Sequence, residues 1–148
     1  MSSPAAPAPR ATEPPVPYLI RPPMVVDCSA LSAVLFDEPM RDAALARLVG
    51  HNLHAPNLLD HEIASVALKK LRQDWPADSV ALALADYRAY DIQLHPVDIA
   101  AQFELAQRYQ ISAYDAAYLW LAAELRAPLA TFDPKLAAAA QAHLNGPP

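Results

Sequence analysis

The sequence predicts an α/β sandwich built around a mostly parallel sheet. Short apolar segments alternate along the chain with longer stretches of helical character. Strands separated by helices of this length favour parallel pairing. Of the 148 residues, 54% are hydrophobic and only 18% are charged, so a sizeable core is expected. The length fits one domain with a tail.

The expected strands cover residues 24–27, 53–55, 92–95 and 129–132. The expected helices cover residues 29–36, 40–49, 58–72, 77–89, 98–109, 113–125 and 134–143.

In the first half of the chain, polar and proline residues separate these elements. Two valines before Asp27 indicate a buried strand, and Ser29 is expected near the N-cap of the next helix. Pro39 separates that helix from the following one, and Pro56 follows the second strand. Each boundary rests on a residue that caps a helix or cannot continue one.

The second half of the chain follows the same pattern. Pro76 begins one helix and Asp98 caps another. Residues 113–125 form the most apolar helix, which leads through Pro128 into the last strand. Asp133, followed directly by proline, opens the final helix.

Eight of the 16 prolines lie in the first 23 residues. Because proline fixes φ and lacks an N–H, residues 1–23 are expected to be a disordered Ala/Pro-rich extension, with the folded domain at 24–145. An alternative is that translation starts at Met24. No segment is long and apolar enough to read as a signal peptide or to span a bilayer.

Composition excludes several functional classes. With only two glycines, far apart in the chain, neither a dinucleotide-binding loop nor a P-loop is present. A single cysteine excludes a disulfide framework and Cys-rich metal sites. The five histidines have no zinc-site spacing. A net charge of −5 argues against a simple basic nucleic-acid-binding module, unless a bound metal supplies positive charge locally.

Acidic residues mark the candidate site. Asp27 and Asp133 follow strands, where ligands gather in open parallel sheets, and Asp115 lies in the first turn of the most apolar helix. Either Asp60 or Glu62 adds a fourth carboxylate from the helix after the second strand. Such a cluster suits Mg²⁺ or Mn²⁺, which prefer oxygen ligands.

Each acid also has a purely structural interpretation. Asp133 is a good N-cap, and the segments ending at Asp115 and Asp60 resemble capping boxes. Taken together, however, like charges about 4 Å apart repel by roughly 4 kcal/mol at an effective dielectric near 20. Converging carboxylates would therefore be avoided unless a cation offset them. Cys28 is expected to pack rather than act as a nucleophile, and Tyr114 is expected in the core or at a subunit interface.

Three segments resemble the PIN-domain nucleases, specifically the VapC-type toxins of toxin–antitoxin systems. They are Val25–Leu31, similar to the family's opening strand and turn; Ser112–Ala122, similar to the helix with its third acid; and Ala127–Asp133, similar to its last strand and fourth acid. The resemblance extends from about Met24 to Leu144. It implies a PIN-like three-layer sandwich, with a central sheet of about four to five strands flanked by helices.

The resemblance also implies site residues. Asp27, Glu62, Asp115 and Asp133 correspond to the family's acidic site, with Glu62 preferred to Asp60 as the second acid. Asp27 and Asp115 are expected to bind one or two Mg²⁺ or Mn²⁺ ions directly.

Two neighbouring hydroxyls, those of Ser29 and Thr131, match polar positions that orient substrate. The function implied is metal-dependent hydrolysis of RNA phosphodiester bonds by a cytoplasmic homodimeric toxin, blocked by an antitoxin partner. The alternative is a catalytically inactive PIN-fold binding module that retains the acids as helix caps.

Overall fold

The computed structural model describes residues 3–5 and 20–145. Its elements, in chain order, are β1 (Pro23–Val26), α1 (Cys28–Leu35), α2 (Arg41–Leu48), β2 (Asn52–Pro56), α3 (Leu59–Arg72), α4 (Ala77–Ala89), β3 (Gln93–His95), α5 (Ile99–Tyr109), α6 (Ala113–Leu125), β4 (Leu129–Ala130) and α7 (Pro134–Leu144). The predicted α/β class is confirmed. Within the described ranges, no helix is long and apolar enough to cross a membrane.

The four strands form one sheet in the order β3-β2-β1-β4, and all three pairings are parallel. Val25 of β1 lies opposite His54 on one side and Leu129 on the other. Both valines of β1 are completely buried, as expected for the central strand of a covered sheet. Parallel strands also bring their carboxyl ends to one edge, where the chain turns into the helices.

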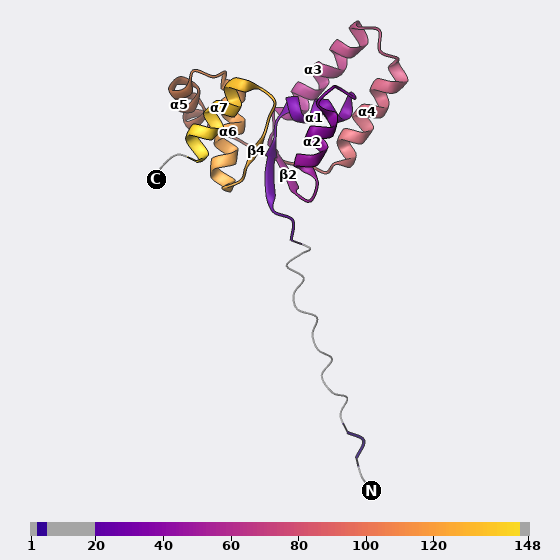
Figure 1. The fold of residues 1–148 in the computed structure, drawn as a ribbon, viewed down its shortest axis with the longest axis vertical. Helices are drawn as coiled ribbons and strands as arrows, with labels where there is room; N and C mark the ends of the chain where they lie inside the picture. The colour runs from indigo at the N-terminus through magenta and orange to yellow at the C-terminus, as the bar shows by residue number, and fades with distance from the viewer. Residues whose placement is uncertain (1–2, 6–19, 146–148) are drawn as a thin grey trace.

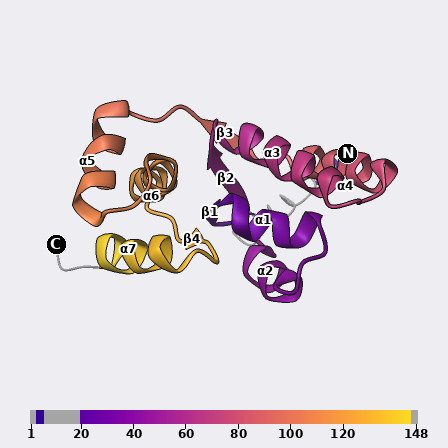
Figure 2. The ribbon, with the colours of Figure 1, turned by 90° about the horizontal axis from the view of Figure 1, so that it is seen from above.

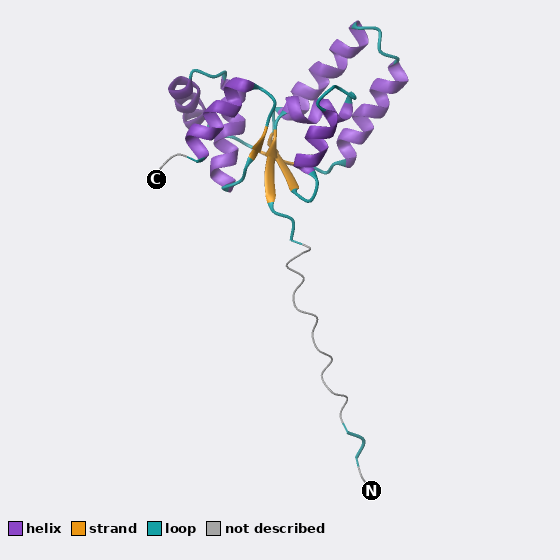
Figure 3. Cartoon of the chain, in the orientation of Figure 1, coloured by secondary structure: helices purple, strands orange, loops and turns teal. Residues whose placement is uncertain are grey.

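Helices cover the sheet on both faces (Figure 1; Figure 2). Helices α5, α6 and α7 lie on one side, and α1, α2, α3 and α4 lie on the other. Figure 3 shows the strands between these two groups. Helix α6 packs closely because its sheet-facing positions include alanines, and Ala116, Ala117 and Leu119 have no exposed surface. The predicted three-layer arrangement is confirmed.

Most boundaries lie within one residue of the prediction, and two of the differences have a clear physical reason. Helix α1 begins at Cys28 because Asp27, and not Ser29, is its N-cap: the Asp27 carboxylate accepts the Ala30 N–H. Strand β4 ends at Ala130 rather than at residue 132. It stops early because the Phe132 N–H donates to the Ser29 hydroxyl, 2.9 Å away, instead of joining the sheet.

The predicted N-terminal extension falls mostly outside the described residues. At its far end, Pro23 already belongs to β1 and lies opposite Asn52.

Candidate active site

The four predicted acids come from four different elements at one edge of the sheet. Asp27 follows β1, and Asp133 lies just beyond β4. Glu62 and Asp115 lie in the first turns of α3 and α6. Burial raises the pKa values of Asp27, Glu62 and Asp115, and the negative charges of neighbouring acids in the group raise them further. The fold therefore brings together the acids that the sequence predicted as a group.

Asp27 is the most enclosed of the four, with only 4% of its surface exposed. Its Oδ1 accepts the Ser29 hydroxyl at 2.7 Å and the Ala30 N–H at 2.9 Å, and its Oδ2 accepts the Thr131 hydroxyl. Burial raises the pKa of Asp27 and the charge of Asp133 adds to that rise, while the three hydrogen bonds oppose it. The carboxylate is thus fixed in orientation by its neighbours.

The hydroxyls of Ser29 and Thr131 link Asp27 to the segment after β4. Ser29 accepts the Phe132 N–H, and Thr131 accepts the Asp133 N–H at 3.0 Å. Both hydroxyls were predicted to orient substrate. In this structure they bind and position the acid.

The sequence left two candidates for the acid on α3, Glu62 and Asp60. The two side chains have different surroundings in the structure. Glu62 accepts the Tyr118 hydroxyl at 2.7 Å, whereas Asp60 is exposed and accepts the Tyr87 hydroxyl at 2.7 Å. Burial raises the pKa of Glu62, and the charges of Asp27 and Asp115 raise it further. Glu62 is therefore the residue that lies with the other acids. The suggested capping role of Asp60 is wrong, since the residue before α3 is Leu58 and has no side-chain cap.

Asp115 and Asp133 have the helix positions that their local sequences predicted. The Ser112 hydroxyl caps α6 by accepting the Asp115 N–H at 3.0 Å. Asp133 caps α7 by accepting the Leu136 N–H at 2.9 Å. Burial raises the pKa of Asp115, and the charges of Asp133 and Asp27 contribute. A capping role for Asp133 therefore coexists with a place in the acidic cluster.

The donor set of the cluster fits a hard divalent cation, since all four side chains offer carboxylate oxygens. None of the ion pairs in the described part of the chain involves these acids. Their mutual repulsion is therefore not offset by a salt bridge. At the same time, across residues 20–145 no three His, Cys, Asp or Glu side chains converge closely enough to form a ready metal-ligand group. These acids could hold a metal ion together only if their side chains moved closer to one another.

Cys28, beside Asp27, is not an activated nucleophile. Its thiol lies 3.4 Å from the Ser32 hydroxyl, and burial raises the thiol pKa to about 12. The charges of Glu62 and Asp27 contribute to that rise. The thiol is therefore protonated at neutral pH, which excludes it as a thiolate nucleophile.

Sequence reasoning missed two residues that support the site. The hydroxyl of Tyr118 donates to Glu62. The place of Tyr118 one helical turn after Asp115 was the available signal. Arg47 of α2 donates to the carbonyl oxygens of Leu129 at 3.0 Å and Thr131 at 3.4 Å. No sequence pattern pointed to Arg47, because its partners lie more than 80 positions away.

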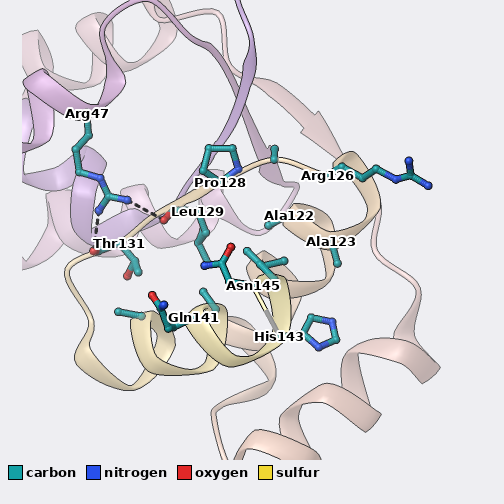
Figure 4. A pocket seen from close by; sticks show the side chains of 14 residues that line it. Arg47, Ala122, Ala123, Arg126, Pro128, Leu129, Thr131, Gln141, His143 and Asn145 are labelled. Atoms are coloured by element: carbon teal, nitrogen blue, oxygen red, sulfur yellow. Dashed lines mark hydrogen bonds between the residues drawn. The ribbon is translucent and has the colours of Figure 1, made fainter. Parts of the chain in front are cut away.

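Arg47 lies against the free edge of β4, at one end of a cavity of about 660 Å³ between that strand and α7 (Figure 4). In Figure 4, Gln141 of α7 and Asn145, which directly follows that helix, line the same space. Since Thr131 also binds Asp27, the guanidinium holds the segment that positions the first acid.

We expect Arg47→Ala to lower the free energy of unfolding by about 1–2 kcal/mol, the worth of two such hydrogen bonds. Cleavage should also fall, because Thr131 is held less firmly. Urea unfolding monitored by circular dichroism measures the first effect. The matched control is Arg41→Ala on the same helix, whose contacts are long ion pairs at 3.8 and 3.9 Å, so it should remain close to wild type. Equal unfolding curves for both variants would contradict the proposed support by Arg47.

Acidic side chains at the carboxyl ends of parallel strands are an arrangement that suits metal-dependent hydrolytic proteins of the α/β class. Comparison with known proteins specifies the family. The PIN domain model matches residues 24–142. The chain belongs to the PIN-domain family.

Curated relatives agree with this assignment. VapC ribonuclease Mb0985 of Mycobacterium bovis and Ribonuclease VapC9 of Mycobacterium tuberculosis are each 35% identical over 121 residues, covering 80% of this chain and 92% of the relative. Ribonuclease VapC3 of Pyrobaculum aerophilum is 28% identical, covering 77% and 92%. The predicted resemblance to VapC-type PIN proteins is confirmed.

A solved structure supports the fold. The crystal structure of PAE2754 from Pyrobaculum aerophilum superposes with a TM-score of 0.65 over 80% of each chain. Its sequence identity is 20%, so this likeness bears on the fold alone.

Proposed function

We propose that this protein hydrolyses RNA phosphodiester bonds at the centre formed by Asp27, Glu62, Asp115 and Asp133, with Mg²⁺ or Mn²⁺ as cofactor. By its relatives, the chain is an endoribonuclease of the toxin class of toxin–antitoxin systems. The observation that carries the proposal is that four carboxylates lie near one edge of the sheet, close enough for their charges to interact, without a compensating ion pair. Carboxylates this close together need positive charge to offset their repulsion, and a divalent cation supplies it.

The proposed metal ligands are Asp27 and Asp115. A bound divalent ion would polarise a phosphoryl oxygen and lower the pKa of a water molecule. Asp27 is suited to ligation because its hydrogen bonds hold the carboxylate in one orientation.

The other two acids have supporting roles. Glu62, with a raised pKa and one oxygen bound to Tyr118, is suited to position the attacking water and accept its proton. The remaining acid, Asp133, is fixed by its capping bond and adds negative charge beside Asp27 and Asp115. Ser29 and Thr131 keep Asp27 oriented, and the family resemblance supports for them a further role in orienting the substrate.

The proposed biological setting follows from the class. RNA is the substrate, a cognate antitoxin blocks the site, the active form is a homodimer, and the protein acts in the cytoplasm. Residues 24–145 form the nuclease domain, preceded by the Ala/Pro-rich segment. Exposed apolar side chains on α3 and α4 provide surface for protein partners, among them Leu68 and Leu82.

The test is cleavage of total cellular RNA by the purified protein in Mg²⁺ or Mn²⁺, with EDTA as the control. Discrete fragments that disappear in EDTA are the expected result. Co-purified antitoxin is first removed and its absence checked by mass spectrometry. Intact RNA after incubation with folded, metal-supplied protein would favour the inactive binding module instead.

A further inference from the structure

A second cavity, of about 610 Å³, lies beside the acidic cluster. Glu62 belongs to the acidic cluster and also lines this cavity. Tyr114, another residue of the cavity wall, directly precedes Asp115 in the sequence. The rest of the wall includes Leu58, Val66 and the protonated thiol of Cys28. A substrate held at the acids would therefore extend into a space with largely apolar walls.

Tyr114 is the unusual member of this wall. Its side chain is 66% exposed although it lies in the first turn of α6, next to an acid of the site. Tyr118, one turn later, is 1% exposed and donates to Glu62. Tyr114 therefore does not pack in the core of the subunit, whereas its expected alternative place at a subunit interface stays a prediction.

The cavity has the wrong charge for a phosphate group. No lysine or arginine lines it, and the Glu62 carboxylate would repel an anion. A nucleobase fits these surroundings better, since it has apolar faces and a polar edge. Its face stacks on an aromatic ring, and its edge meets hydrogen-bonding groups such as those of His61, Ser65 and Glu62.

We infer that this cavity binds an unpaired nucleobase of the RNA next to the scissile phosphate, stacked on Tyr114. The inference rests on the proposed ribonuclease function and adds to it a base-binding site. Because a base within a duplex cannot reach such a wall without leaving the stack, the preferred substrate is single-stranded or looped RNA.

The experiment separates binding from cleavage. A fluorescent single-stranded RNA oligonucleotide is titrated with the full chain in EDTA, which prevents cleavage. Tyr114→Ala is expected to weaken binding about 5- to 100-fold, the usual range for losing one stacked base, whereas Tyr114→Phe keeps the ring and stays within about 3-fold of wild type. In the metal-supplied cleavage assay, Tyr114→Ala raises KM more than it lowers kcat.

The matched control is Phe103→Ala on α5, which removes another aromatic ring of similar exposure, 64%. This variant should bind RNA like wild type. Weakening of the same size in Phe103→Ala and Tyr114→Ala, while the wild type cleaves RNA, would overturn the base-binding site and leave the proposed function standing.

Two other outcomes are also distinguishable. A wild type that neither binds nor cleaves RNA would remove the proposed function, and the inference with it. If Tyr114→Ala instead dissociates an oligomer in analytical ultracentrifugation while each subunit binds RNA normally, Tyr114 belongs to a subunit interface and the inference is wrong.

Discussion

Replacement of Asp115 by asparagine should reduce metal-dependent RNA cleavage by about 100-fold or more. The variant loses one negatively charged oxygen from the proposed metal-binding pair, and metal ligation with its associated chemistry depends on that charge. Asparagine has nearly the same shape, and the backbone N–H that binds Ser112 is unchanged. The loss of activity should therefore not reflect loss of the fold.

The same replacement should make the metal-free protein harder to unfold. The charges of Asp133 and Asp27 raise the pKa of Asp115, which means that the ionised group is repelled in the folded state. A neutral amide removes that repulsion. The measurement is a thermal melt in EDTA at neutral pH, where Asp115→Asn is expected to have the higher Tm.

Glu124→Gln is the matched control for both effects. Glu124 is an exposed acid in the last turn of the same helix, α6. Its neutralisation should change neither cleavage nor the metal-free Tm appreciably. If the two variants lost activity equally, or if Asp115→Asn melted below wild type in EDTA, the assignment of Asp115 to a repulsive metal-binding cluster would be contradicted.

Mg²⁺ or Mn²⁺ should raise the Tm of the wild-type protein, and EDTA should reverse the increase. A ligand that binds only the folded state stabilises it by about 2.7 kcal/mol at 100 times its Kd. For a domain of this size, that corresponds to a rise of several degrees, roughly 5–10 °C. The physical source is the relief of repulsion among the four acids.

The sign of the pH dependence follows from the raised pKa values of Asp27, Glu62 and Asp115. Between the ordinary carboxyl pKa and the raised one, the folded protein holds more protons than the unfolded chain. The contribution of these acids to metal-free stability therefore falls as pH rises through that window, and it recovers below it. The stabilisation by metal should increase as the pH rises through the same window, because protonated carboxyls bind metal poorly.

Differential scanning fluorimetry across this pH range, with and without metal, measures both trends. Sodium chloride at matched ionic strength controls for general screening of charge. Asp115→Asn should show a smaller metal-induced rise than wild type. An equal rise in the two proteins would indicate that the cation binds elsewhere.

The order of elements and three of the four acids were predictable from local sequence. Strands such as β1 are short apolar runs, and helices such as α5 and α7 begin directly after a capping aspartate. The general rule that ligands gather at the carboxyl ends of parallel strands then pointed to Asp27 and Asp133. A local pattern is sufficient here because hydrophobic periodicity and helix capping depend on neighbours within about one helical turn.

Only the tertiary structure decided between Glu62 and Asp60. The two residues are two positions apart on one helix, yet one binds Tyr118 and the other binds Tyr87. The full set of hydrogen bonds to Asp27 was likewise not predictable. Besides the Ala30 N–H, its carboxylate accepts the hydroxyl of Thr131, which lies 104 positions along the chain. Such partners meet only when the sheet forms. The sequence therefore determined which chemical groups the protein carries to this edge. The packing of α6 and β4 against β1, and of α3 against α1, decided which of them lie near one another.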